Sequence, residues 1–90
     1  MAGLLKKHAG KEVVIDTDSG WVYIGTLKGS DNFCITLENA DAFDYAETSL
    51  SKHEYIMLVK NDGVAPNRKE LDILKNRVVA ITLLSDILDK

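Results

Sequence analysis

Apolar residues recur at every second position in residues 21–28, where Tyr23 and Leu27 share a parity with Gly25, and in residues 32–39, where Phe33, Ile35 and Leu37 share another, as in strands that bury one face. The polar segment Lys28–Asn32 between them predicts a turn. Gly25 interrupts the first strand, and a glycine inside a strand marks a sharp bend or a close backbone contact. We therefore expect two bent strands, the first of which can contribute to both sides of a small barrel.

Three further segments have strand character. Residues 11–16 and 78–83 are dense in β-branched residues, and in residues 68–74 Leu71 and Ile73 alternate with more polar neighbours. Five short strands are too few for a sandwich. The pattern predicts a mostly β fold with short helices, in which a five-stranded, strongly bent antiparallel sheet closes on itself.

A short N-terminal helix is expected at residues 4–9, because Gly10 can adopt the left-handed conformation that ends a helix. Leu4 and Leu5 would then cover one end of the core. This places a helix before the first strand.

A second helix is expected at residues 52–62. Ser51 and Glu54 have the spacing of a capping box, and Gly63 supplies a stop signal. A strand is the alternative, because the segment contains the continuous apolar run Tyr55–Val59. The length of the segment and its two end signals favour the helix.

Residues 41–67 thus form a helical insert between the third and fourth strands. Its first part, residues 41–47, is acidic and is either irregular or an extension of the third strand. The tail after residue 83 is expected to make a short helical turn or to lie flat on a neighbouring element.

Composition narrows the classes of ligand. Ninety residues suit one domain, residues 1–90, with a thin core. The net charge of −3 argues against a protein that coats DNA through its phosphates. Residues 31–54 carry six acids and one lysine, whereas residues 68–77 carry four bases and two acids. A site for an anion is therefore expected near the basic segment.

Candidates for catalysis are few. The chain has one cysteine, Cys34, and two histidines, and no spacing joins them into a metal site or a nucleophile–base pair. We expect neither an enzyme nor a cofactor. The N-terminal residues lack the long apolar run of a signal peptide or a membrane span. With the single cysteine, this predicts a reducing compartment: the cytoplasm, or the nucleus if the source is eukaryotic.

The bent hairpin resembles the first signature of the Sm and Sm-like RNA-binding proteins, the family of the LSm and Hfq types. The matching residues are Gly10-x-x-Val13-x-Ile15 and Gly20-x-x-Tyr23-x-Gly25-x-Leu27-x-x-x-Asp31. Residues 73–81 resemble the shorter second signature. The resemblance implies an N-terminal helix, a five-stranded barrel and a ring of roughly five to seven identical subunits. In that ring, the fourth strand of one subunit pairs with the fifth strand of the next.

The resemblance also implies a ligand, because such rings hold single-stranded RNA at the inner rim with the turns after the second and fourth strands. On this chain the candidate RNA-binding residues are Asp31, Asn32, Phe33, Lys75, Asn76 and Arg77. Rings and guanidinium groups stack on bases, amides read base edges and cations meet phosphates. The expected ligand is uridine- or adenine-rich RNA, and the expected role is RNA processing or RNA chaperoning within a ribonucleoprotein.

The segment after Asp31 is one residue shorter than the family pattern. By strand parity, Phe33 is then expected in the core beside Ile35, while Asn32 and Cys34 face the pore. An alternative function follows from this departure: a scaffold ring that has lost the RNA pocket and binds a protein partner through its acidic insert.

Overall fold

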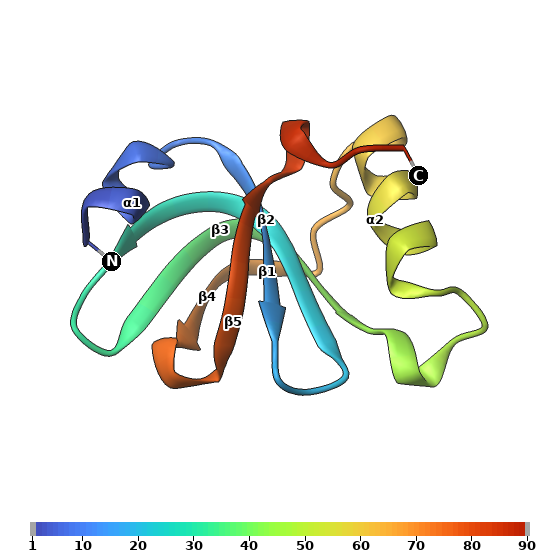
Figure 1. Cartoon of the computed structure of the whole chain (residues 1–90), viewed down its shortest axis with the longest axis horizontal. Helices are drawn as coiled ribbons and strands as arrows, with labels where there is room; N and C mark the ends of the chain where they lie inside the picture. Colours follow the sequence, from blue (N-terminus) through green and yellow to red (C-terminus); the bar gives the residue numbers. More distant parts are fainter. Residues whose placement is uncertain (1, 90) are drawn as a thin grey trace.

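A five-stranded antiparallel sheet forms the centre of the molecule (Figure 1). The structure, a computed structural model, describes the backbone of residues 2–89 and the side chains of residues 5–89. The strands are β1 (Glu12–Thr17), β2 (Trp21–Ser30), β3 (Cys34–Asp44), β4 (Arg68–Leu74) and β5 (Val78–Leu83). The helices are α1 (Ala2–Lys7) and α2 (Lys52–Asp62), with 3₁₀ turns η1 (Tyr45–Glu47), η2 (Lys75–Arg77) and η3 (Leu84–Asp86).

The strand order is β4-β3-β2-β1-β5, and each pair is antiparallel. The mostly β fold predicted from the sequence is confirmed. β4 and β5 are the two outer strands, joined by the three-residue turn η2. Within the described part of this chain, each therefore keeps one side that pairs with no other strand.

Of the two features that a glycine inside a strand predicts, the close backbone contact is confirmed at Gly25. A Cβ atom on Gly25 would lie 2.8 Å from the Cβ and 2.9 Å from the Cα of Ala40, which is closer than packed atoms approach. The pairing of β2 with β3 shifts by one residue at this point, and Asn39 takes a positive φ of 49°. A glycine facing a bulge bends and twists the sheet.

One face of the sheet encloses the barrel core. Alternate residues of β1 to β4 meet Leu5 of α1 there, which is 3% exposed. The members of this core cluster are Leu5, Val13, Ile15, Leu27, Ile35, Leu37, Ala40 and Ile73. The prediction that Leu5 covers the core is confirmed, whereas the side chain of Leu4 lies outside the described residues.

The other face of the sheet is covered by α2, which lies at the opposite end of the long axis from α1 (Figure 1). This second cluster consists of Val14, Val22, Ile24, Tyr55, Ile56, Val59 and Leu84. Because both faces are covered, Val13, Val14 and Ile15 are all fully buried. Strands buried on both faces carry continuous hydrophobic runs instead of alternating ones.

The helix predicted for residues 52–62 is confirmed and the alternative strand is wrong. Ser51 Oγ accepts the N–H of Glu54, and the Glu54 carboxylate accepts the N–H of Ser51, which completes the capping box. Gly63 follows with a φ of 91°. Local end signals outweigh the apolar run because that run supplies one buried helical face, made of Tyr55, Ile56 and Val59.

The turn predicted at Lys28–Asn32 is displaced, because β2 continues to Ser30 and β3 begins only at Cys34. The other segments follow their predictions more closely. The N-terminal helix ends at Lys7, two residues before the predicted end, and Gly10 has the expected left-handed conformation with a φ of 80°. The acidic segment extends β3 as far as Asp44 before η1 begins. The tail makes the short helical turn η3. No helix in residues 2–89 is long and apolar enough to cross a membrane.

Candidate nucleic-acid interface

The two turns predicted to bind RNA lie side by side. Cys34 pairs with Leu74, and the N–H of Lys75 donates to the C=O of Phe33 over 2.8 Å. A hollow of about 320 Å³ between the turns is lined by Asn32, Phe33, Leu74, Lys75 and Asn76. Four of the six predicted residues therefore share one hollow, and the Lys75 ammonium group places a positive charge beside it.

Asp31 shapes the first turn. Its carboxylate accepts the N–H of Phe33 over 2.7 Å and the N–H of Cys34 over 2.8 Å. These two hydrogen bonds, followed by the charge of Lys75, hold the pKa of Asp31 below its usual value of 3.8. Asp31 thus orders the backbone that presents the neighbouring side chains.

Phe33 is 75% exposed, so the prediction that it joins the core is wrong. The parity argument starts one residue too early, because β3 begins at Cys34. Phe33 belongs to the turn that Asp31 holds, and turn residues do not follow strand alternation. From Ile35 to Glu38 the parity holds, since Ile35 and Leu37 are fully buried, and it shifts at the bulge of Asn39. Asn32 is exposed and Cys34 half-buried, as expected for residues outside the core.

Arg77 lies outside the lining of the hollow. Its Nε is 3.1 Å from Oδ1 of Asp18, and its C=O accepts the N–H of Asp18 over 3.0 Å. The sequence does not show this pairing, because Asp18 belongs to the distant turn between β1 and β2. The ion pair is exposed and therefore weak, so the guanidinium group can exchange Asp18 for another anion.

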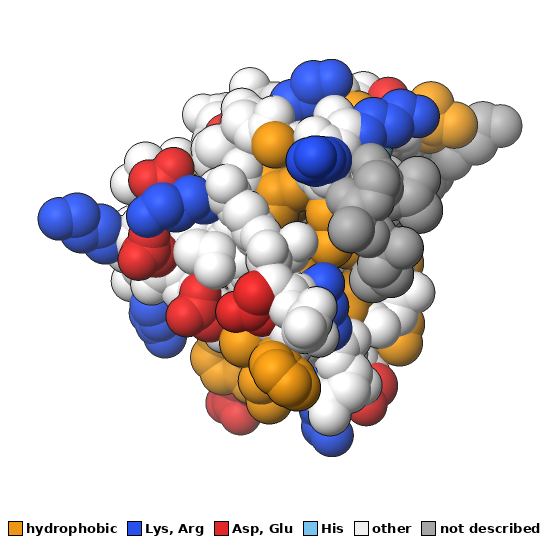
Figure 2. All heavy atoms as spheres, turned by 90° about the vertical axis from the view of Figure 1, so that its left-hand side faces the viewer, with side chains coloured by type: hydrophobic (Ala, Val, Ile, Leu, Met, Phe, Trp, Pro, Cys, Tyr) orange, Lys and Arg blue, Asp and Glu red, His pale blue; other side chains and the backbone are white. Residues whose placement is uncertain are grey.

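The surface around the hollow combines apolar and charged groups. Figure 2 faces the side of the molecule that is on the left in Figure 1, and hydrophobic side chains gather at its lower edge with both acidic and basic side chains nearby. Phe33 and Leu74 are two of the exposed large hydrophobic residues, at 75% and 54% exposure. Leu74 was not among the predicted site residues. Its position at the end of β4, directly before the turn at residues 75–77, could have indicated that it lies at the site.

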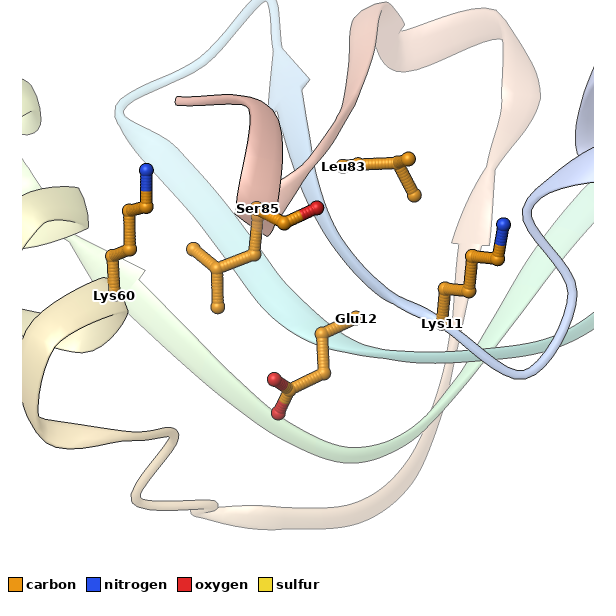
Figure 3. A pocket seen from close by; sticks show the side chains of 6 residues that line it. Lys11, Glu12, Lys60, Leu83 and Ser85 are labelled. Carbon is orange, nitrogen blue, oxygen red and sulfur yellow. The ribbon is translucent and has the colours of Figure 1, made fainter. Parts of the chain in front are cut away.

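A larger hollow of about 450 Å³ lies where the end of α2 meets β1 and the segment after β5 (Figure 3). Lys11 and Lys60 stand on opposite sides of it, with Ser85 between them. The Lys60 ammonium group donates to the C=O of Ile87. The two positive charges do not converge on one point, so this hollow lacks the arrangement of an anion site.

The acids of residues 31–54 are mostly engaged in internal hydrogen bonds. Asp41 accepts the hydroxyl of Tyr55 over 2.6 Å and the amide of Asn67 over 3.0 Å, and Asp44 accepts the N–H of Ala46. Asp31 and Glu54 cap their own turns, as described above. The insert therefore presents fewer free carboxylates than its composition indicates.

Comparison with known sequences identifies the family. The LSM domain matches residues 3–65, which is more than half of the chain. The chain belongs to the LSM domain family. LSM proteins bind RNA and are not enzymes, which agrees with the expectation that this chain catalyses no reaction. The match ends before residues 73–81, so the second signature stays a prediction. No curated protein sequence matches the chain significantly.

Solved structures share the fold at low sequence identity. A Sm protein of Pyrococcus abyssii in complex with a uridine heptamer is 19% identical, with a TM-score of 0.62 over 90% of this chain and 93% of that chain. The Sm-like protein SmAP (LSm) of Methanococcus vannielii is 20% identical, with a TM-score of 0.59 over 90% of each chain. A Sm-like protein of Pyrobaculum aerophilum is 21% identical, with a TM-score of 0.61 over 92% of this chain and 50% of that chain. At these identities the likeness establishes the Sm fold of this chain.

Proposed function

We propose that this protein binds single-stranded RNA as a subunit of a homo-oligomeric ring. The RNA lies at the inner rim, against the turns of residues 31–33 and 75–77. The observation that carries the proposal is the hollow between these turns, where an exposed aromatic ring, two amides and an ammonium group meet. The Pyrococcus abyssii protein with the same fold was solved with a uridine heptamer, which supports RNA as the ligand.

Each residue of the hollow contacts a different part of the RNA in this proposal. Phe33 offers a face on which a base can stack, an interaction worth about 1–3 kcal/mol per base. The side-chain amides of Asn32 and Asn76 can exchange hydrogen bonds with a base edge. Lys75 meets a phosphate. Asp31 contacts no RNA in this proposal, since its carboxylate is occupied by backbone N–H groups.

The ring forms through the two outer strands. β4 and β5 each keep an unpaired side within the described chain, and Val79 on β5 is 66% exposed. An unprotected outer strand with an apolar side chain is a template for pairing with another chain. Antiparallel pairing of β4 with β5 of the next subunit, repeated roughly five to seven times, closes a ring. One modest site per subunit then becomes a strong one through multivalency.

Fluorescence anisotropy with labelled oligouridylate and oligoadenylate tests the site. Lys75→Ala should weaken binding and reduce the log–log salt slope by about 0.7, the contribution of one neutralised phosphate. Lys11→Ala is the matched control, because it removes the same charge at the distant hollow of Figure 3. Phe33→Ala should weaken binding without destabilising the fold, since the ring is largely exposed.

The outcomes distinguish a wrong site assignment from a wrong function. Equal affinities of the Lys75→Ala and Lys11→Ala variants would contradict the site assignment. No binding to either RNA by the wild type would contradict the function and favour the scaffold alternative, in which a protein partner binds the insert. Binding in the expected pattern would support RNA as the ligand. The role that we infer for this binding is RNA processing or RNA chaperoning, in the cytoplasm or, in a eukaryote, the nucleus.

A further inference from the structure

We propose that Trp21 forms a second base-stacking platform, which receives an RNA base one turn away from the hollow. The inference rests on the proposed RNA-binding function and extends the path of the RNA beyond it. Trp21 is 37% exposed and is a member of neither core cluster. A large aromatic ring that is not required by the core is available to a ligand.

The indole ring is held in a defined orientation. It stacks on Tyr23, with ring centroids 6.2 Å apart and an angle of 10° between the planes. Both side chains project from the same face of β2, because residues two apart share a face. Tyr23 packs on the barrel core and so anchors the pair. Pre-ordered rings lose little conformational freedom on binding, which favours affinity.

The backbone of Trp21 is anchored as firmly as its ring. Its N–H donates to Ser19 Oγ over 3.2 Å, and its C=O accepts the hydroxyl of Thr17 over 2.8 Å. Thr17 is buried, at 8% exposure, and its hydroxyl also contacts that of Ser19. This network fixes the turn between β1 and β2 and, with it, the position from which the indole projects.

Turn η2 connects the hollow with the turn that precedes Trp21. On one side, Lys75 hydrogen-bonds to Phe33; on the other, the C=O of Arg77 accepts the N–H of Asp18 in the turn before Trp21. In Figure 1 the β1–β2 turn and η2 both lie at the lower edge of the molecule. Arg77 therefore lies next to the turn that precedes Trp21, and its guanidinium group is exposed there.

Trp21 lies close to the end of turn η2. Thr17 pairs with Val78 of β5, and Trp21 lies opposite Thr17 on β2. Trp21 is thus two strands away from the residue that follows Arg77, or about 10 Å at the usual strand spacing. β2 is the middle strand of the sheet, so the pairing of β4 with β5 that is proposed for the ring does not involve it.

A nucleic-acid base is the ligand that fits this surface. Asp44 caps η1, and Asp18 lies beside Arg77, whose positive charge offsets that of the Asp18 carboxylate. The platform consequently offers a flat aromatic face instead of a free charge. Every base has a stacking face, so the contact should add affinity with little dependence on sequence.

The test uses Trp21 as its own reporter, because it is the only tryptophan in the chain. The full chain is titrated with oligouridylate long enough to pass both turns, while anisotropy reports binding and tryptophan emission reports stacking. Emission should be quenched in parallel with binding. Polyphosphate, which carries charge but no bases, should bind without comparable quenching. Trp21→Leu should weaken RNA binding about 5- to 100-fold, whereas Trp21→Phe should stay within about 5-fold of wild type.

The possible results decide between the two proposals. RNA binding with unchanged tryptophan emission would overturn the platform and leave the proposed function standing. Equal RNA affinity of a folded Trp21→Leu variant would do the same. If that variant fails to fold, the wild-type titration alone decides. Absence of RNA binding by the wild type would overturn both proposals.

Discussion

Replacing Gly25 by alanine should be the most damaging single-methyl addition in β2. The added Cβ would lie 2.8 Å from Ala40 Cβ, 2.9 Å from Ala40 Cα and 3.1 Å from the C=O oxygen of Glu38. Two of these three atoms belong to the backbone, so no side-chain rotation relieves the contact. The strands must separate at the bend that closes the barrel.

The magnitude follows from the cost of overpacking a tight core. Inserted methyl groups cost about 1–3 kcal/mol, and a clash with backbone belongs at the upper end, about 2–3 kcal/mol. For a chain of this size each kcal/mol lowers the melting temperature by about 4–8 °C. We therefore expect Gly25→Ala to melt about 10–20 °C below the wild type.

Gly29→Ala is the matched control in the same strand, because its Cβ would meet nothing within 4 Å. It should leave the free energy of unfolding unchanged or raise it by less than about 1 kcal/mol. Urea denaturation of both variants at one protein concentration measures the difference. The double variant Gly25→Ala/Ala40→Gly removes the 2.8 Å contact and should recover part of the loss. Equal stability of the two single variants would refute the close-approach argument.

Three other changes test single contacts. Ser51→Ala removes the N-cap of α2 and should lower the free energy of unfolding by about 1 kcal/mol in urea, with Ser49→Ala as the neutral control. Tyr55→Phe keeps the ring but removes its hydrogen bond to Asp41, and should cost about 1–2 kcal/mol by the same measurement. The depressed pKa of Asp31 contributes stability that is present above pH 3.8 and is lost as the pH falls through its folded-state pKa. The urea midpoint should therefore fall less between pH 5 and about pH 3 in Asp31→Asn than in the wild type; equal falls would contradict this contribution.

Local signals in the sequence predict most of this fold. The bounds of α2, β4 and β5 are as predicted, because a capping box, a glycine stop and a clean alternation all act within a few residues. Gly25 indicates the bend for the same reason. The sequence does not predict that α2 covers one face of the sheet. This packing joins segments far apart in the chain, and no local pattern specifies which face a distant helix covers.

The candidate site could be predicted only in part from the sequence. Proximity of residues 31–33 to residues 75–77 was expected from the family resemblance and is found. The exposure of Phe33 was not, because parity applies only inside a strand and the Asp31 turn ends before the strand begins. The pairing of Arg77 with Asp18 joins positions far apart in the chain, so it could not be read from spacing.

Native mass spectrometry of the full chain mixed with a uridine heptamer tests the central claim most directly, since it reports subunit number and bound RNA in the same ion. We predict rings of roughly five to seven subunits that carry RNA, and loss of the RNA but retention of the ring in a Phe33→Ala/Lys75→Ala variant. Monomers, or rings that carry no RNA at concentrations where binding is expected, would contradict the account.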